Sequence, residues 1–245
     1  MRTQIRIRLF FAGCLCFGCM AGHAQDVPKG LELTEIVNIA ETYRQTPSLS
    51  FNVLYQYADS ADQNDPLETM YGTYKIQNGK YWAMIDSTLI VQGNNYNVSV
   101  FYNDSVISIA DPQQYTNLMQ LPFLDSLFQA QNVDSIRVIL SNDSARILRM
   151  YFNARSQYTN CQILYDPNSY LLQSMTYCMK TQSTAPTASS TAVNIARVSV
   201  SFSNYSYQPV DDSYFREDTF IYKQNGQFFT QAPYANFQVM VNTSN

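Results

Sequence analysis

The segment TPSLSFNVLYQY, residues 46–57, decides the fold because the spacing of apolar residues changes within it. Before it, residues 31–45 place apolar side chains at three- and four-residue spacings, which predicts an amphipathic helix that ends before Pro47. From Leu49 onward apolar and polar residues alternate, which predicts a half-buried β-strand. The folded part of the chain therefore begins with a helix that leads directly into a sheet.

Short alternating segments separated by turn residues continue this pattern. The Asn78-Gly79 and Asn225-Gly226 pairs are strong hairpin signals. A second helix, kinked by Pro122, is expected over residues 115–131. Further strands are expected over residues 49–57, 70–77, 80–86, 88–91, 96–102, 106–110, 135–140, 145–152, 158–165, 171–179 and 193–207.

Strands joined in sequence by tight turns predict one continuous meander, and a sheet of that length must twist and curl. The two helices that interrupt it would then cover its inner side. We therefore predict an α+β, mostly β fold: a curled antiparallel sheet, or incomplete barrel, closed by helices on its concave face.

The first 24 residues are predicted to be a signal peptide. Three arginines precede the apolar run 9–21, and residues 22–24 place small side chains where a signal peptidase reads them. The run is shorter than the roughly 20 residues that cross a bilayer as a helix. The mature protein is therefore expected to fold and work outside the cytoplasm.

A lipid anchor is an alternative to a freely diffusing exported protein. Cys14 and Cys19 lie in sequences that loosely resemble a lipobox, so lipid anchoring at the outer membrane stays open.

Residues 25–245 are expected to form a single domain, with a C-terminal extension from about residue 209.

Charge and histidine content exclude several classes of function. The chain has 15 basic and 19 acidic residues, and three basic ones leave with the signal peptide, so the exported balance is 12 − 19 = −7. This acidity argues against nucleic-acid binding, which uses clustered Lys and Arg. His23, the only histidine, also leaves with the signal peptide, which removes the commonest general base and metal ligand. We therefore expect that the protein is not an enzyme and that it has no catalytic residue, metal or cofactor. An active site made of two carboxylates, as in glycosidases, stays open as an alternative.

Two cysteines remain in the exported chain, Cys161 and Cys178, on either side of a predicted hairpin turn. If Tyr165 pairs with Leu171, the two sulfur atoms point to opposite faces of the hairpin and no bond forms. One bulge would move them to the same face. A disulfide between them therefore stays open.

Taken in order, the segments resemble the LolA/LppX-like family of periplasmic lipoprotein and lipid carriers, over residues 31–207. The resemblance implies an incomplete barrel around a hydrophobic cavity that holds acyl chains. One departure is Asn78, which stands where the shuttling carriers have a basic latch residue. The motifs that carry the resemblance are residues 46–51, 71–76, 80–84, 88–94, 101–103 and 163–167.

The leading hypothesis is a non-enzymatic periplasmic carrier or binding protein for an acyl chain, lipid or lipoprotein, which meets membranes only peripherally. The alternative is a structural or adhesion component of the cell envelope that uses the same fold and binds a partner protein through its tyrosine-rich tail, residues 214–237. The candidates for the apolar lining are Phe51, Val53, Tyr55, Trp82, Met84, Leu89, Val91, Phe101, Leu124, Leu127 and Phe128.

An Asp-Ser pair followed by an apolar residue or Thr recurs along the chain. It resembles the O-glycosylation acceptor that Bacteroidota use on exported proteins, although Asp-Ser is also favoured in turns. The candidate acceptors are Ser60, Ser87, Ser105, Ser126, Ser135 and Ser144.

Overall fold

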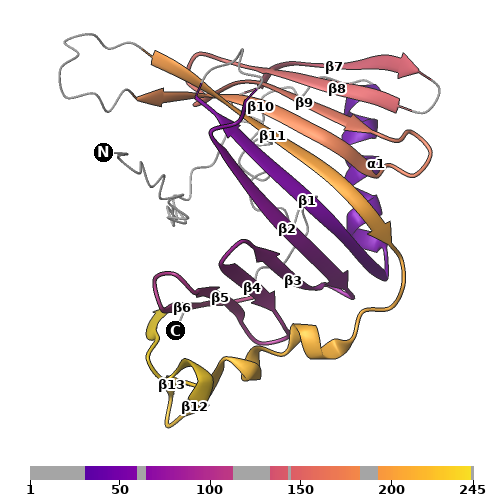
Figure 1. Ribbon diagram of the computed structural model, residues 1–245. Helices are drawn as coiled ribbons and strands as arrows, with labels where there is room; N and C mark the ends of the chain where they lie inside the picture. Colours follow the sequence, from indigo (N-terminus) through magenta and orange to yellow (C-terminus); the bar gives the residue numbers. More distant parts are fainter. Residues whose placement is uncertain (1–30, 60–64, 113–132, 143–144, 183–192, 244–245) are drawn as a thin grey trace, which may run out of the picture.

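A 12-stranded sheet forms the framework of the protein (Figure 1). This computed structural model describes residues 31–59, 65–112, 133–142, 145–182 and 193–243. Helix α1 (Leu31–Gln45) has the predicted bounds and leads into the sheet at Ser48. No helix in the described ranges is long and apolar enough to cross a membrane. The described residues are thus mostly β, as predicted, and contain one α-helix.

The strands of the large sheet begin and end close to the predicted positions. The first half contains β1 (Ser48–Ala58), β2 (Glu68–Gln77), β3 (Lys80–Ile85), β4 (Thr88–Gln92), β5 (Asn97–Phe101) and β6 (Val106–Ala110). The second half contains β7 (Val133–Asn142), β8 (Ala145–Phe152), β9 (Tyr158–Tyr165), β10 (Leu172–Gln182) and β11 (Val193–Ser206).

The prediction of a single continuous meander is wrong. The strand order is β14-β6-β5-β4-β3-β2-β1-β11-β10-β9-β8-β7, so there are two meanders that meet where β1 pairs with β11. Val53 of β1 lies opposite Gly72 of β2 on one side and Phe202 of β11 on the other. Gly72 is required there because a Cβ would approach the Val53 side chain to 2.6 Å. Turn residues signal only local pairs, so the sequence did not show this long-range pair.

The C-terminal segment packs on the large sheet and adds a strand to it. Strand β14 (Gln238–Asn242) pairs with β6 and is the parallel edge strand of an otherwise antiparallel sheet. Before it, the hairpin of β12 (Ile221–Gln224) and β13 (Gln227–Thr230) turns at Asn225-Gly226, as predicted, with positive φ angles of 51° and 81°. The tyrosine-rich tail that is expected to bind a partner, residues 214–237, is not exposed throughout, because Phe215, Phe220 and Ile221 are buried.

The sheet has a hydrophobic core on each of its two faces. We call the face that α1 covers the helix face; its core includes Ile39 and Tyr43 of the helix together with Phe51, Ile163 and Val200 of the strands. We call the opposite face the far face. Its core lies over β4, β5 and β6, beneath the C-terminal segment, and contains Leu89, Val91, Val98, Val100, Ile107, Ile109, Phe220 and Ile221.

The large sheet is curled and not closed, as predicted. The second predicted helix, residues 115–131, lies outside the described residues, as do residues 1–30. Closure of the concave face by helices therefore stays a prediction.

A buried carboxylate attaches the C-terminal segment to the sheet. Glu217, in a short 3-10 helix (Glu217–Thr219), accepts a hydrogen bond of 3.0 Å from the backbone N–H of Asn95. Its other oxygen is buried against Gly93, where any Cβ would overlap the carboxylate. Glycine at 93 therefore permits this close approach of the C-terminal segment.

We predict that Phe220→Ala strongly destabilises the protein. Phe220 is 6 % exposed in the far-face core, and truncation of a buried Phe typically costs about 3–5 kcal/mol. The neighbouring Tyr222→Ala is the control because Tyr222 is 44 % exposed. Chemical denaturation measures both; equal effects would show that the C-terminal segment does not support the sheet.

Candidate functional site

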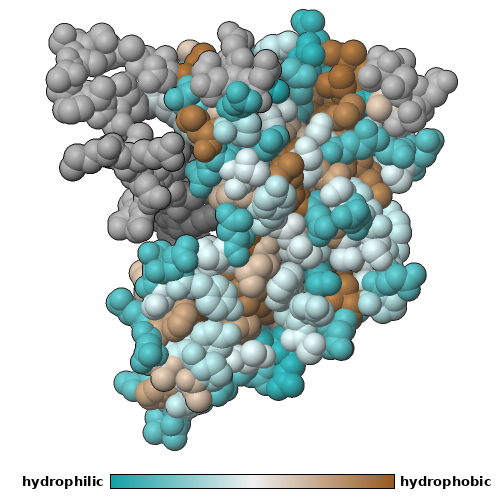
Figure 2. Space-filling model, in the orientation of Figure 1, coloured by the Kyte–Doolittle hydropathy of each residue, from teal (hydrophilic) through white to brown (hydrophobic). Residues whose placement is uncertain are grey.

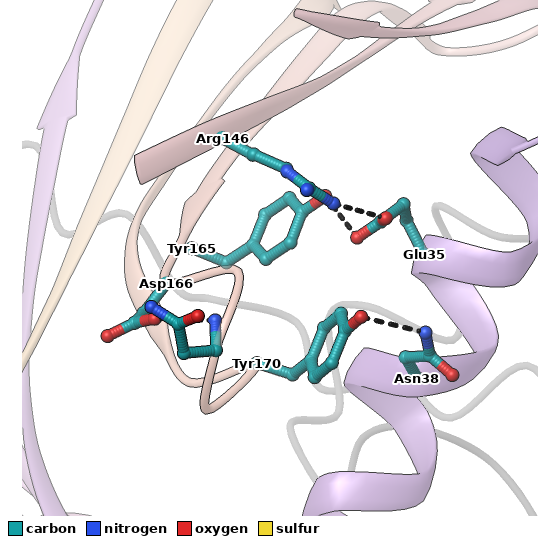
Figure 3. A network of polar contacts seen from close by, with 7 residues as sticks. Glu35, Asn38, Arg146, Tyr165, Asp166 and Tyr170 are labelled. Atoms are coloured by element: carbon teal, nitrogen blue, oxygen red, sulfur yellow. Dashed lines mark hydrogen bonds and ion pairs between the residues drawn. The ribbon is translucent and has the colours of Figure 1, made fainter. Parts of the chain in front are cut away.

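A buried ion pair attaches α1 to the helix face (Figure 3). The carboxylate of Glu35, 2 % exposed, lies 2.6 Å from Nη1 of Arg146 on β8 and accepts a hydrogen bond of 2.6 Å from the hydroxyl of Tyr165 on β9. Burial, together with the neighbouring carboxylate, raises the pKa of Tyr165 above its usual range, so the phenol stays protonated and donates. Both oxygens of Glu35 are thus satisfied inside the protein.

The β9–β10 turn positions a second contact with the same helix. The Asp166 carboxylate accepts hydrogen bonds from the backbone N–H groups of Asn168 (2.7 Å) and Ser169 (3.3 Å), and Tyr170 has a positive φ of 56°. This turn stacks the ring of Tyr170 on that of Tyr165 with centroids 6.1 Å apart. The hydroxyl of Tyr170 accepts a hydrogen bond of 3.0 Å from Asn38 of α1 (Figure 3).

Tyr43, in the last turns of α1, makes a third attachment. Its hydroxyl lies 2.6 Å from that of Tyr205 and accepts a 3.0 Å hydrogen bond from the backbone N–H of Leu172. Tyr205 in turn donates to the carbonyl oxygen of Leu172 at 2.8 Å. The register of β9 and β10 shifts at Leu172, so the two phenols pair backbone groups at an irregular point of the ladder.

Beyond these attachments, β1 and β2 give the helix face a surface of aromatic and apolar side chains. The rings of Phe51 and Tyr74 stack with centroids 5.2 Å apart and an interplanar angle of 3°. The hydroxyls of Tyr55 and Tyr74 lie 2.8 Å apart. Burial raises the pKa of both phenols, and of Tyr177 on β10, above the usual range. The surface is thus apolar, with protonated hydroxyl groups set into it.

The structure divides the predicted lining residues between the two faces of the sheet. Phe51, Val53 and Tyr55 lie on the helix face, and the register places Phe101 on that face too. Four others, Trp82, Met84, Leu89 and Val91, belong to the far-face core. Leu124, Leu127 and Phe128 lie outside the described residues. Alternation along a strand predicts two sets of side chains, but the sequence alone did not show that a core covers each set.

Cys161 and Cys178 are free and buried. Cys161 lies opposite Tyr177, two residues from the partner that the simple hairpin register predicts, while Cys178 lies opposite Asn160. An even shift leaves the faces unchanged, so the two sulfur atoms lie on opposite faces of the sheet. Burial raises the pKa of the Cys161 thiol above its usual range, which makes it a poor nucleophile.

The proposed glycosylation sites lie in different settings. Ser87 and Ser105 lie in the β3–β4 and β5–β6 turns, and Ser87 accepts a 2.7 Å hydrogen bond from Asn103. Ser135 lies in β7, at an edge of the sheet. Ser60, Ser126 and Ser144 lie outside the described residues. Modification of all six stays a prediction.

A polar cavity of about 570 Å³ lies between the β4–β5 turn and the C-terminal segment. Charged and amide side chains line it, including Lys80, Asn94, Asp212 and Arg216, so it does not suit a hydrocarbon. No cluster of three or more His, Cys, Asp or Glu is placed to hold a metal ion in the described part of the chain.

Sequence reasoning missed the polar attachment of α1. Glu35 falls on the apolar side of a helix whose first turns also carry Glu32, and a lone carboxylate among apolar neighbours was the available signal. Its partners Arg146 and Tyr165 are more than 100 residues away. Nothing in local spacing connects them.

No protein-family model matches the chain, and no curated protein matches it in sequence. Among solved structures, it resembles a LolA superfamily protein from Nitrosomonas europaea (TM-score 0.35, 11 % identity), covering 76 % of this chain and 98 % of the other. It also resembles the Mycobacterium tuberculosis lipoprotein LppX (TM-score 0.37, 10 % identity, covering 74 % and 97 %) and a DUF1329 family protein from Desulfovibrio piger (TM-score 0.38, 7 % identity, covering 76 % and 96 %).

We predict that Glu35→Ala weakens the fold because it leaves Arg146 and Tyr165 without their common acceptor. Breaking a buried ion pair by removing one partner typically costs about 3–5 kcal/mol, and the partial exposure of Arg146 puts this pair at the lower end. Glu41→Ala is the control in the same helix, because the exposed Glu41–Arg44 pair contributes little. If urea denaturation shows equal small effects, the attachment at Glu35 does not hold α1 in place.

Proposed function

We propose that this protein is a non-enzymatic binding protein of the cell envelope that holds an acyl chain, or a ligand of similar apolar character, against the helix face of its open sheet. The observation that supports this most directly is the apolar and aromatic character of the helix-face core, in which Phe51 and Val53 of β1 and Tyr74 of β2 are buried and Tyr55 packs against them. Because the curled sheet is not closed, it leaves an open side through which a long, thin ligand can enter.

The energetics favour a hydrocarbon on this surface. Removing apolar area from water contributes about 25 cal/mol per Å², or about 0.8 kcal/mol for each methylene group. The one ion pair described on the helix face, Glu35–Arg146, has its charges satisfied by each other and by Tyr165. The half-buried carboxylate of Glu68, opposite Tyr57 at the start of β2, is a further charge on this face, so a hydrocarbon would lie away from that end of the sheet.

The phenols provide a second type of contact. Tyr55, Tyr74 and Tyr177 stay protonated at all physiological pH values because burial raises their pKa. Neutral hydroxyl groups in apolar surroundings are strong orienting groups for a carboxyl or ester oxygen. We therefore favour a ligand with a hydrocarbon chain and an oxygen-bearing head over a plain hydrocarbon.

The alternative, an envelope scaffold that binds a partner through residues 214–237, receives less support. Phe215, Phe220 and Ile221 of that segment pack against the sheet and are not available to a partner. Deleting residues 209–245 would expose the far-face core, so loss of a complex in that deletion would not separate the two functions.

The test is ligand binding by the exported protein and two variants. Native mass spectrometry of protein purified from its own envelope should show a non-covalent lipid adduct, and the delipidated protein should bind the fluorescent fatty acid cis-parinaric acid. Tyr55→Lys should weaken this binding at least about tenfold, because it places a charge in the apolar surface.

Leu54→Lys is the matched control for this experiment. Leu54 precedes Tyr55 on β1 and points to the far face, so the same charge is added at the same height of the strand. Circular dichroism melting of both variants checks that each is folded. A protein that carries no lipid and binds no fatty acid, or equal binding by Tyr55→Lys and Leu54→Lys, would refute the carrier function.

A further inference from the structure

Three arginines lie together on the far face of the second half of the sheet. Arg137 of β7 and Arg149 of β8 lie directly opposite each other in the antiparallel register. The row through Arg149 continues across Gln162, Thr176 and Ser199. Arg197 of β11 lies on the same face in the next row, opposite Cys178. We call the far face of β7–β11 that carries these arginines the arginine face.

None of the three arginines forms an ion pair in the described part of the chain. No residue that the register pairs on this face of β7–β11 is acidic. The ion pairs of the described residues involve other cations, namely Arg44, Lys80, Arg146 and Arg216. Because the exported chain has a balance of 12 − 19 = −7, a face with cations alone is a marked asymmetry.

The arrangement is unfavourable for the fold taken alone. Like charges directly opposite on neighbouring strands destabilise a sheet. The Nε atoms of Arg149 and Arg197 are buried with no hydrogen-bond partner in the described structure, and Arg149 makes only a long 3.4 Å contact with Gln162. An anion above this face would offset both costs.

The neighbours of the arginines suit a lipid–water boundary. In Figure 1 α1 lies behind β9, β10 and β11, so the view is onto the arginine face, and in Figure 2 hydrophilic side chains alternate with pale and hydrophobic ones over these strands. Tyr151 and Ile195, 40 % and 39 % exposed, point outward on the same face. Aromatic rings and aliphatic groups beside cations are typical of surfaces that sit at membrane head groups.

We propose that the arginine face docks on the head groups of an anionic lipid bilayer. With strands about 4.8 Å apart, Arg149 on β8 and Arg197 on β11 are separated by about 14 Å. That separation is too wide for all three arginines to converge on one small anion, and it suits an array of head groups. This proposal rests on the proposed function in one respect, which is that a carrier must meet a membrane. With the arginine face on the bilayer, the helix face would point away from it.

Vesicle co-sedimentation of the exported protein tests this proposal. We expect binding to vesicles of phosphatidylglycerol mixed with phosphatidylcholine, little binding to phosphatidylcholine alone, and loss of binding at high salt. The variant Arg137→Ser/Arg149→Ser/Arg197→Ser should reduce the apparent affinity roughly a hundredfold, since each cation near an anionic membrane contributes a factor of about five.

The matched control is Arg44→Ser/Arg216→Ser/Lys223→Ser, which removes the same charge from other parts of the surface. The single variant Arg137→Glu, at an exposed position, keeps the test valid if the triple variant fails to fold. Equal vesicle binding by the arginine-face and control variants would overturn the proposal. Binding to a soluble polyanion such as heparin without binding to anionic vesicles would also overturn it.

The two proposals fail separately. Arginine-face variants should retain wild-type binding of cis-parinaric acid in vesicle-free solution, because these side chains lie on the face opposite the ligand surface. Loss of vesicle binding with retained fatty-acid binding supports the docking surface. Loss of fatty-acid binding in Tyr55→Lys with retained vesicle binding concerns the carrier surface alone.

Discussion

The pairing of β1 with β11 is the contact on which the rest of the structure depends. It joins residues about 150 positions apart in the chain and turns two meanders into one 12-stranded sheet. Closing so long a loop has an entropic cost. The hydrogen bonds of this strand pair and the helix-face core that forms across the junction together offset that cost. β1 also begins directly after α1, so the same strand sets the position of the helix over the sheet.

From this junction the helix-face core extends over both halves of the sheet, whereas the far-face core lies over β4–β6. The second half buries the helix face, where Glu35, Asn38 and Tyr43 of α1 bond to side chains or backbone of β8–β11 and the β9–β10 turn. The strands β4–β6 also bury the far face, under the C-terminal segment, which ends by adding β14 to the edge beside β6. Helix α1 and the C-terminal segment thus cover different faces of the sheet. The far face of β7–β11 is the arginine face.

Local features of the structure were predictable, and long-range ones were not. The period change at residues 46–57 places α1 and β1 correctly, and Asn78-Gly79 and Asn225-Gly226 mark true hairpins. The β1–β11 pair, the parallel β14 and the burial of Phe220 depend on contacts between distant residues, for which spacing holds no signal. Within the candidate site, the sequence correctly placed Phe51, Val53 and Tyr55 on one face by alternation. It grouped them with Trp82 and Met84 because it could not show that the far face has its own core.

The attachment of α1 constrains how a ligand would reach the helix face. Its described polar contacts are with strands β8–β11 and the β9–β10 turn, and they include a buried ion pair and phenols that bond to the backbone of Leu172. Lifting the helix would leave the charges of Glu35 and Arg146 unpaired, at a cost of several kcal/mol. It would also leave the backbone groups of Leu172 without their partners, at a cost of about 1–3 kcal/mol each. Side chains of the helix face farther along the sheet, such as Met70, Ile85 and Phe101, are only half-buried and carry no such ties to α1 among the described residues. Entry from the β2–β5 side therefore costs less than displacement of α1, and a ligand would reach Tyr74, which is 1 % exposed, only when neighbouring side chains on this face move aside.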